Sequence, residues 1–300
     1  MHAAVAVAYG RRSRTMIEAP PAVLHDVRDA LDRLGVRPRR IVLISPLERH
    51  KGRRCAYRVD SEDGRTLKAR HFESVGEAER QRVLREGLEA TFAPVLTQAG
   101  RVLLEEWIDG VPLTDRDPDS FASIGGALLG RLHARPLAVD APAVFETQKW
   151  AAAALSDLTI LASAEILDAH TVAVLEAGIR QRDPGTASAA LVHTDFCAEN
   201  MLIDTHGLLR VIDNEQFTVA PAGYDLGRTF DRWPMSAAAW ASFRVAYRSA
   251  AVRPADALGF WKLVAALAGA RLRHQRTPAR LPATLVLLRR FAADERFVDS

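Results

Sequence analysis

The fold of this 300-residue chain is decided by the stretch His193-Thr194-Asp195-Phe196-Cys197-Ala198-Glu199-Asn200. The stretch has the spacing His-x-Asp-x4-Asn, and a second aspartate, Asp213, follows thirteen residues after the asparagine. Two short apolar runs, residues 201–204 and 208–213, are joined by a Thr-His-Gly turn and predict a hairpin. A loop and the end of a neighbouring hairpin can place an acid and two oxygen ligands in one small volume.

Phosphoryl transfer needs such a set of groups. An acid must orient and deprotonate the acceptor hydroxyl, and oxygen ligands must hold magnesium on the triphosphate. A surface turn rich in polar residues is the structural alternative for Asp195, Asn200 and Asp213. The joint spacing and the flanking apolar runs favour the functional interpretation.

The first 110 residues have the pattern of a small α+β region. Apolar residues at helical spacing predict helices over residues 21–34 and 75–90. Short apolar runs predict strands over residues 41–44, 55–59, 66–70 and 101–108. From residue 120 onward the pattern becomes mainly helical, over residues 121–134, over an Ala-rich stretch at 150–181, and in two further segments after residue 235.

The charge pattern and composition exclude several classes of protein. Lysine and arginine outnumber acids by 20 to 13 over residues 1–101 and by 11 to 1 over residues 232–293, whereas residues 102–231 have 8 against 20. No nucleic-acid-binding motif accompanies the basic segments, so we expect no nucleic-acid partner. No stretch approaches the ~18 apolar residues of a membrane span, so we expect no membrane partner. The two cysteines, Cys55 and Cys197, are too few for a disulfide framework, and a cytoplasmic protein is predicted.

The chain resembles the aminoglycoside phosphotransferases and choline kinases, small-molecule kinases that share the protein-kinase fold. The resemblance extends from about residue 35 to residue 290 and includes the loop and hairpin above. It implies a bilobal α+β fold, with a small N-terminal lobe built on an antiparallel sheet and a larger, mainly helical C-terminal lobe. The implied boundaries are a tail over residues 1–20 that could be flexible, an N-lobe over 21–106 and a C-lobe over 107–300.

The resemblance also assigns roles to the residues of the loop and hairpin. By this likeness Asp195 is the catalytic base, and Asn200 and Asp213 hold Mg²⁺. His193 braces the loop, and Asp225 ties the loop from behind. The family usually has glycine where this chain has Thr194, which should crowd the loop slightly.

Further roles fall on the N-lobe. Lys68, in Thr-Leu-Lys-Ala-Arg, matches the lysine that binds the α- and β-phosphates of ATP, and Glu79 matches the helix glutamate that pairs with it. The segment Leu104-Glu105-Glu106-Trp107-Ile108-Asp109-Gly110 resembles the hinge, where the Glu106 carbonyl and the Ile108 amide meet the nucleobase. The basic segment at residues 48–54 resembles a phosphate loop only weakly.

The predicted function is therefore ATP- and Mg²⁺-dependent transfer of the γ-phosphoryl group to a hydroxyl of a small molecule, such as an antibiotic, sugar, amino alcohol or nucleoside-like acceptor. A non-catalytic nucleotide-binding pseudokinase that acts through a basic face is the alternative. A protein kinase is disfavoured, because only eleven residues separate Asp213 from Asp225 and no Ala-Pro-Glu anchor follows.

Two features bear on the acceptor. Nine of the 20 aromatic residues fall between Phe217 and Trp261, where they could form a cage for a quaternary ammonium group or fill the core. The arginines from residue 232 onward either solvate outer helix faces or face the cleft. In the second case they would repel polycationic aminoglycosides and favour a phosphorylated, carboxylated or neutral acceptor. The sequence leaves the acceptor, the choice of ATP or GTP, the oligomeric state and the biological role open.

Overall fold

The structure, a computed structural model, describes residues 21–44, 55–138, 141–214, 216–252 and 255–294. The predicted N-terminal tail and the basic segment at residues 48–54 lie outside these residues. The chain divides into two compact units. The first comprises the described residues within Met1–Asp115 and Met201–Glu215, and the second those within Arg116–Asn200 and Gln216–Ser300.

The first unit is built on a five-stranded antiparallel sheet with the order β1-β2-β3-β5-β4. Its strands are β1 (Pro38–Leu43), β2 (Cys55–Ser61), β3 (Thr66–His71), β4 (Val95–Ala99) and β5 (Val102–Glu106). The pairing of β1 with β2 and of β2 with β3 confirms the predicted meander. The strand β4, which the sequence analysis did not predict, completes the edge of the sheet.

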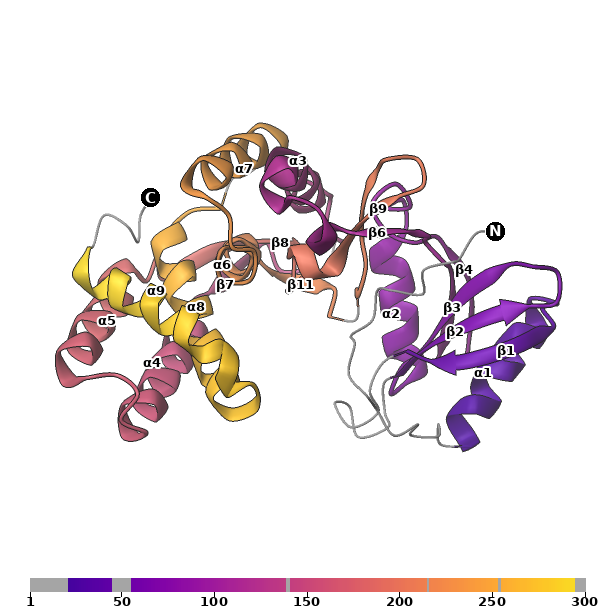
Figure 1. Cartoon of the computed structure of the whole chain (residues 1–300), viewed down its shortest axis with the longest axis horizontal. Helices are drawn as coiled ribbons and strands as arrows, with labels where there is room; N and C mark the ends of the chain where they lie inside the picture. Colours follow the sequence, from indigo (N-terminus) through magenta and orange to yellow (C-terminus); the bar gives the residue numbers. More distant parts are fainter. Residues whose placement is uncertain (1–20, 45–54, 139–140, 215, 253–254, 295–300) are drawn as a thin grey trace. The chain divides into compact units, whose positions relative to one another are not determined.

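Helices α1 (Pro21–Arg33) and α2 (Val75–Arg85) cover opposite faces of this sheet (Figure 1). Val27 of α1 belongs to one buried cluster with Leu67 and Ala69 of β3. Ala78 of α2 belongs to another cluster, with Leu103 of β5. Because side chains alternate along a strand, Lys68 lies on the α2 side of the sheet, between two residues that pack on α1.

A second, three-stranded sheet has the order β10-β9-β6, with β6 (Gly110–Pro112), β9 (Met201–Asp204) and β10 (Leu209–Val211). The antiparallel pairing of β9 with β10 confirms the predicted hairpin. This hairpin groups with the first unit, although the expected C-lobe boundaries place it in the second. The reason is that β9 pairs with β6, and that the Arg210 guanidinium donates hydrogen bonds to the carbonyls of Glu89 and Phe92.

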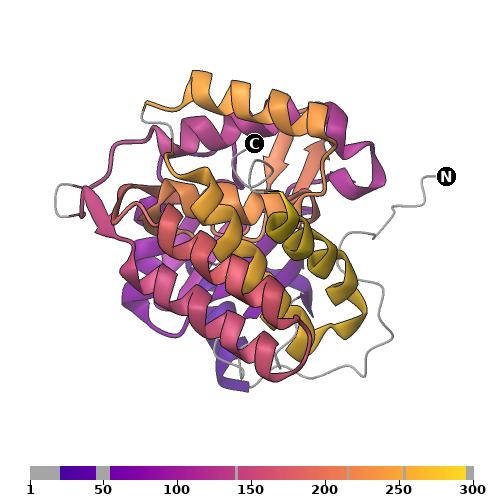
Figure 2. The same ribbon diagram turned by 90° about the vertical axis from the view of Figure 1, so that its left-hand side faces the viewer.

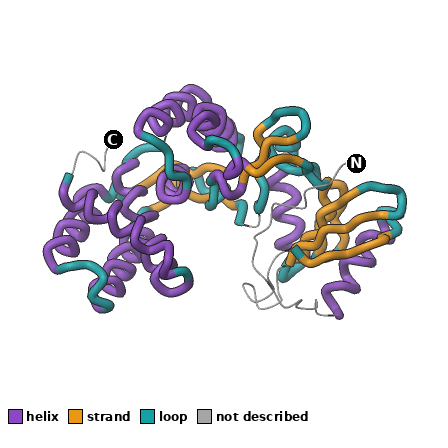
Figure 3. The backbone as a smooth tube through the Cα atoms, viewed as in Figure 1, coloured by secondary structure: helices purple, strands orange, loops and turns teal. Residues whose placement is uncertain are grey.

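The second unit is mainly helical (Figure 3). Its helices are α3 (Ala122–His133), α4 (Gln148–Ser163), α5 (Ala169–Arg182), α6 (Ala222–Arg232), α7 (Ala237–Ala250), α8 (Leu258–Arg276) and α9 (Leu281–Ala293). Helices α4 and α5 lie side by side, with α8 and α9 packed against them (Figure 2). A small sheet, β11-β8-β7, is formed by β7 (Val144–Glu146), β8 (Thr186–Val192) and β11 (Thr218–Pro221). No helix in the described part of the chain is long and apolar enough to cross a membrane.

The Ala-rich stretch predicted as one helical region forms two helices, α4 and α5. The chain turns at Glu165, whose φ of 56° is left-handed, and α5 begins with Asp168 as its N-cap. The Asp168 side chain accepts a hydrogen bond from the Thr171 backbone N–H, which is the ordinary capping geometry. The periodicity of alanine alone does not reveal this break.

Close helix packing in the second unit depends on glycine. A Cβ added at Gly227 of α6 would lie 2.2 Å from the carbonyl oxygen of Trp261 of α8. A Gly227→Ala variant should therefore lose roughly 3 kcal/mol of unfolding free energy, because backbone must move to admit the methyl group. Thermal unfolding measures the loss. Gly76→Ala in α2 is the matched control, since nothing lies within 4 Å of the added Cβ. Equal midpoints for the two variants would contradict the prediction.

Candidate active site

The loop of residues 193–200 is held from behind by a buried carboxylate. Asp225, in the first turn of α6, is fully buried and accepts hydrogen bonds from the backbone N–H groups of His193 at 2.6 Å and Thr194 at 2.5 Å. The Nε2 atom of His133 lies 3.3 Å from Asp225, and its Nδ1 atom lies 2.9 Å from the hydroxyl of Tyr247. Asp225 thus ties the loop to α3, α6 and α7.

Thr194 has a φ of 67°, in the left-handed region that glycine adopts most easily. A β-branched residue is strained in this conformation. The crowding expected at Thr194, where the family usually has glycine, is therefore strain of the backbone. The hydrogen bond from the Thr194 N–H to Asp225 helps to hold this conformation.

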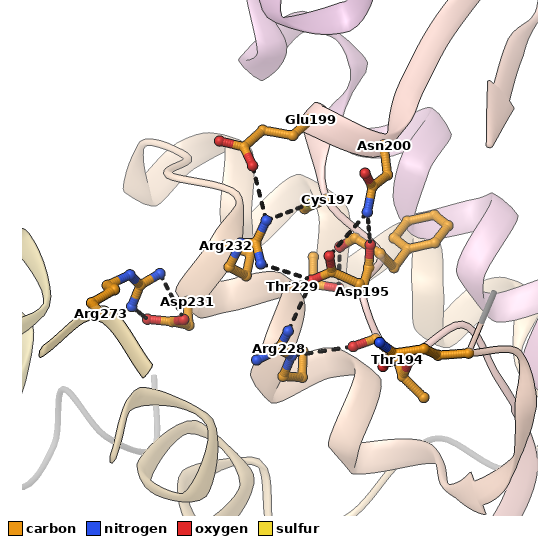
Figure 4. A network of polar contacts seen from close by, with 12 residues as sticks. Thr194, Asp195, Cys197, Glu199, Asn200, Arg228, Thr229, Asp231, Arg232 and Arg273 are labelled. Atoms are coloured by element: carbon orange, nitrogen blue, oxygen red, sulfur yellow. Dashed lines mark hydrogen bonds and ion pairs between the residues drawn. The ribbon is translucent and has the colours of Figure 1, made fainter. Parts of the chain in front are cut away.

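Asp195 is surrounded by three donors (Figure 4). Its Oδ1 atom lies 3.0 Å from Nη2 of Arg228 and 3.1 Å from Nη1 of Arg232. Its Oδ2 atom accepts a hydrogen bond of 3.1 Å from the side-chain amide of Asn200. Burial raises the pKa of Asp195, but the guanidiniums of Arg232 and Arg228 outweigh it, so the pKa lies below its usual value. Asp195 is therefore held in its ionised form.

The sequence analysis did not assign Arg228 or Arg232 to this site. Both lie on α6, three and seven residues after Asp225, so all three residues share one helix face. Arg228 also donates to the Thr194 carbonyl at 3.1 Å. The sequence analysis predicts no helix over residues 222–232, and a helix there is what places these three residues together.

The side chain of Asn200 is oriented by two hydrogen bonds. Its amide nitrogen donates to the backbone carbonyl of Asp195 at 2.9 Å as well as to the carboxylate, which leaves the amide oxygen to bind a cation. Mg²⁺ is commonly held by one or two protein oxygens together with phosphates and water. The described residues contain no group of three or more His, Cys, Asp or Glu that could hold a metal. A Mg²⁺ ion bound by one or two protein oxygens and by phosphates does not need such a group.

The second expected Mg²⁺ ligand, Asp213, belongs to the first unit and follows β10. Asp213 is half-buried, and its backbone has a left-handed φ of 62°. Asp213 is one of the four non-glycine residues with positive φ in the described chain. Such backbone conformations often occur where a functional side chain must point in one direction.

The expected pair of Lys68 and Glu79 does not form. Lys68 is 8% exposed, whereas the Glu79 side chain points outward because the buried face of α2 is Ala78, Gln81 and Arg85. The acid beside Lys68 is Glu105, which is its cross-strand neighbour on β5 and is 1% exposed. We therefore correct the assignment of Glu79, because helix phase turns it away from the sheet.

Glu105 lies in a buried cluster of positive charge. Its Oε1 atom lies 2.6 Å from Nη1 of Arg85 and 3.3 Å from Nε of Arg70. Burial raises the pKa of Glu105, but Arg70, Arg85 and Lys68 together lower the pKa to about 2. Because the folded-state pKa lies below the ordinary value of 4.5, this stabilisation is present above pH 4.5 and is lost as the pH falls toward 2.

Replacing Glu105 by glutamine should cost roughly 3–5 kcal/mol of unfolding free energy at pH 7, because it leaves buried cations without their anion. Glu79→Gln, which alters an exposed carboxylate on α2, should change the unfolding free energy by less than about 0.5 kcal/mol. Urea unfolding of the two variants beside the parent chain measures both values. The prediction fails if the Glu105 variant unfolds at the same urea concentration as the parent.

The expected nucleobase contacts lie at the end of the five-stranded sheet. Glu106 is the last residue of β5, and its backbone N–H donates to the Pro94 carbonyl at 3.0 Å. Ile108 follows in the segment that leads to β6. Both residues belong to the first unit, as Lys68 does.

The aromatic residues of the second unit mostly fill its core. Of the nine aromatic residues between positions 217 and 261, the buried ones are Phe217, Trp233, Trp240, Phe243, Tyr247, Phe260 and Trp261. Lys262, itself fully buried, places its Nζ atom 4.3 Å from the ring centroid of Phe230 and 5.7 Å from that of Trp240. The chain's own ammonium group therefore occupies this aromatic cluster.

Comparisons with known proteins bear on the family and the fold of the chain. The sequence pattern of the family described as "Phosphotransferase enzyme family" matches residues 53–261. No curated protein matches the chain. Three solved structures illustrate the likeness of fold.

A macrolide 2'-phosphotransferase, MphH from Brachybacterium faecium, is 17% identical with a TM-score of 0.60, over 90% of this chain and 98% of its own. A choline/ethanolamine kinase family protein from Mesorhizobium loti is 21% identical with a TM-score of 0.55, over 81% of this chain and 86% of its own. The ADP-bound aminoglycoside phosphotransferase APH(2'')-Ib is 15% identical with a TM-score of 0.51, over 87% of this chain and 95% of its own. With a family match over more than half of its length, the chain belongs to the phosphotransferase enzyme family, and it has the protein-kinase-like fold of small-molecule kinases.

Proposed function

We propose that this phosphotransferase moves the γ-phosphoryl group of ATP to a hydroxyl of a small molecule in a Mg²⁺-dependent reaction. The observation that carries the proposal is the arrangement around Asp195. A carboxylate has about four acceptor positions. Among the described residues, Arg228 and Arg232 approach Oδ1 and Asn200 approaches Oδ2, so Oδ2 can still accept a hydrogen bond from a hydroxyl.

In this proposal each remaining site residue has one task. Lys68 binds the α- and β-phosphates, and Asn200 and Asp213 hold Mg²⁺, which neutralises charge on the phosphates. The Glu106 carbonyl and the Ile108 amide bind the nucleobase. Asp195 orients the acceptor hydroxyl and takes its proton, and His193 and Asp225 hold the loop in place. Catalysis then comes mainly from positioning and charge neutralisation.

The setting we propose for this reaction is the cytoplasm, where ATP is available and cysteines stay reduced. Cys55 and Cys197 are both buried, and no disulfide bond joins them. Burial also raises the pKa of the Cys197 thiol to about 12, so Cys197 is a packing residue of the loop.

The alternative of a non-catalytic nucleotide-binding protein is weakened by the presence of Asp195, Asn200 and Asp213 at the expected spacing. An assay of ADP release distinguishes the phosphotransferase from the non-catalytic protein. It uses Mg-ATP with neutral, cationic and phosphorylated alcohols as acceptors. We expect slow Mg²⁺-dependent hydrolysis of ATP without an acceptor and faster turnover with one acceptor class. Tight ATP binding without turnover on any acceptor would support the non-catalytic alternative.

A further inference from the structure

The catalytic loop carries two carboxylates, Asp195 and Glu199, and three arginines reach them. Arg228 and Arg232 contact Asp195, as described above. Arg232 also donates to Oε2 of Glu199 at 2.8 Å, and Arg280 donates to Oε1 of Glu199 at 3.1 Å. Three positive charges against two negative ones give these five groups a net charge of +1.

The arginines occupy the positions that an amine would need. In Figure 4, Arg232 lies between Asp195 and Glu199 and donates to both. With Arg280 on its other oxygen, Glu199 has a guanidinium on each oxygen atom. The open position on Oδ2 of Asp195 is taken by the acceptor hydroxyl in the proposed function, so an ammonium group of the same acceptor would lie beside the guanidiniums and be repelled by them.

The same arginines can bind an anion. A guanidinium carries five N–H donors in a planar fork that matches carboxylate and phosphate oxygens. Arg280 lies in the short helical turn Pro278–Arg280, and its side chain is 66% exposed. Its contact with Glu199 uses Nη1, and the exposure of the side chain leaves room for an anion at its other N–H groups.

Other basic side chains of the C-terminal segment are engaged away from this loop. Arg271 forms an ion pair with Asp157, and Arg273 contacts Asp231 and Thr284. Lys262 is buried among aromatic rings. In the described part of this segment, Arg232 and Arg280 form ion pairs with the catalytic loop.

We propose that the acceptor is an alcohol that also carries an anionic oxygen group, a carboxylate or a phosphate ester, and that Arg232 and Arg280 bind this group while the hydroxyl binds Asp195. The inference rests on the proposed function. The transfer step is unchanged: the acceptor oxygen forms a bond to the γ-phosphorus, the bond from that phosphorus to ADP breaks, and the hydroxyl proton passes to Asp195.

Three probes that share a propane-1,2-diol unit and differ in charge at the third carbon test the inference: glycerol 3-phosphate, glycerol and 3-aminopropane-1,2-diol. Their binding is measured by calorimetry on the whole chain, saturated with Mg²⁺ and a non-hydrolysable ATP analogue so that the nucleotide site is filled. Glycerol 3-phosphate should bind at least about tenfold more tightly than the amine, since one charge-assisted hydrogen bond corresponds to about this factor.

Variants identify the arginine responsible. Arg280→Gln should weaken the binding of glycerol 3-phosphate by about tenfold, whereas Arg289→Gln, on the exposed face of α9, should leave it unchanged. Arg280 is exposed, so its variant is expected to fold, and a thermal unfolding curve verifies this. Tighter binding of the amine, equal affinity in the two variants, or no binding of any probe would overturn the inference. Failure of the proposed function would instead show as absence of nucleotide binding or of Mg²⁺-dependent ATP hydrolysis.

Discussion

Replacing Asp195 by asparagine should lower the rate of phosphoryl transfer by roughly 10³-fold, within the range of effects attributed to general acid–base catalysis. The asparagine amide cannot take the proton of the acceptor hydroxyl. Its carbonyl oxygen can still face Arg228 and Arg232, and Asn200 keeps its hydrogen bond to the backbone carbonyl of residue 195 while it loses the one to the side chain, so the loop should largely keep its shape. ATP binding should change by less than about twofold, because the proposed phosphate contact, Lys68, lies on β3 and is unaltered.

The measurement is kcat with a saturating acceptor, together with the dissociation constant of ATP from calorimetry. Glu199→Gln in the same loop is the matched control. Its side chain is 44% exposed and contacts Arg232 and Arg280, so its loss should change kcat by no more than about tenfold. Undiminished turnover in the Asp195 variant would remove Asp195 from the role of base.

The local parts of the fold could be predicted from the sequence. The hairpin formed by β9 and β10 depends on residues close in the chain, with a Gly207 turn whose φ of 80° requires glycine or a strained residue. The antiparallel meander of β1, β2 and β3 is likewise local. Alternation of apolar residues and nearby turn residues are sufficient to predict such elements.

The parts that were missed depend on distant residues or on helix phase. The pairing of β6 with β9 joins segments about ninety residues apart, and no local pattern reports it. Glu79 matched a family position, but the phase of α2 directs the buried Gln81 and Arg85 toward the sheet instead. The contacts of Arg228 and Arg232 with Asp195 likewise join residues that lie more than thirty positions apart in the chain.

The second large effect concerns Asp225, whose two oxygen atoms accept the backbone N–H groups of His193 and Thr194. In Asp225→Asn, one of those oxygens becomes an NH₂ group that faces an N–H donor. A hydrogen bond to a buried charged group contributes about 1.5–3 kcal/mol, and an unsatisfied donor adds a penalty, so we expect a loss of roughly 3 kcal/mol in unfolding free energy. Thermal unfolding measures this loss, with Asp29→Asn on α1, whose side chain is 52% exposed, as the control.

The same substitution should lower kcat at temperatures where the variant remains folded, because Thr194 is then no longer held in its strained left-handed conformation beside Asp195. Tyr247→Phe separates stability from positioning. It removes the hydroxyl beside His133 and leaves both backbone N–H bonds to Asp225 in place, so we expect a smaller loss, about 1 kcal/mol, and a kcat close to that of the parent. If the Asp225 variant kept the parent's kcat while unfolding earlier, Asp225 would stabilise the second unit without positioning the loop. If kcat falls while ATP affinity is retained, the conformation of the loop that carries Asp195 limits the transfer step.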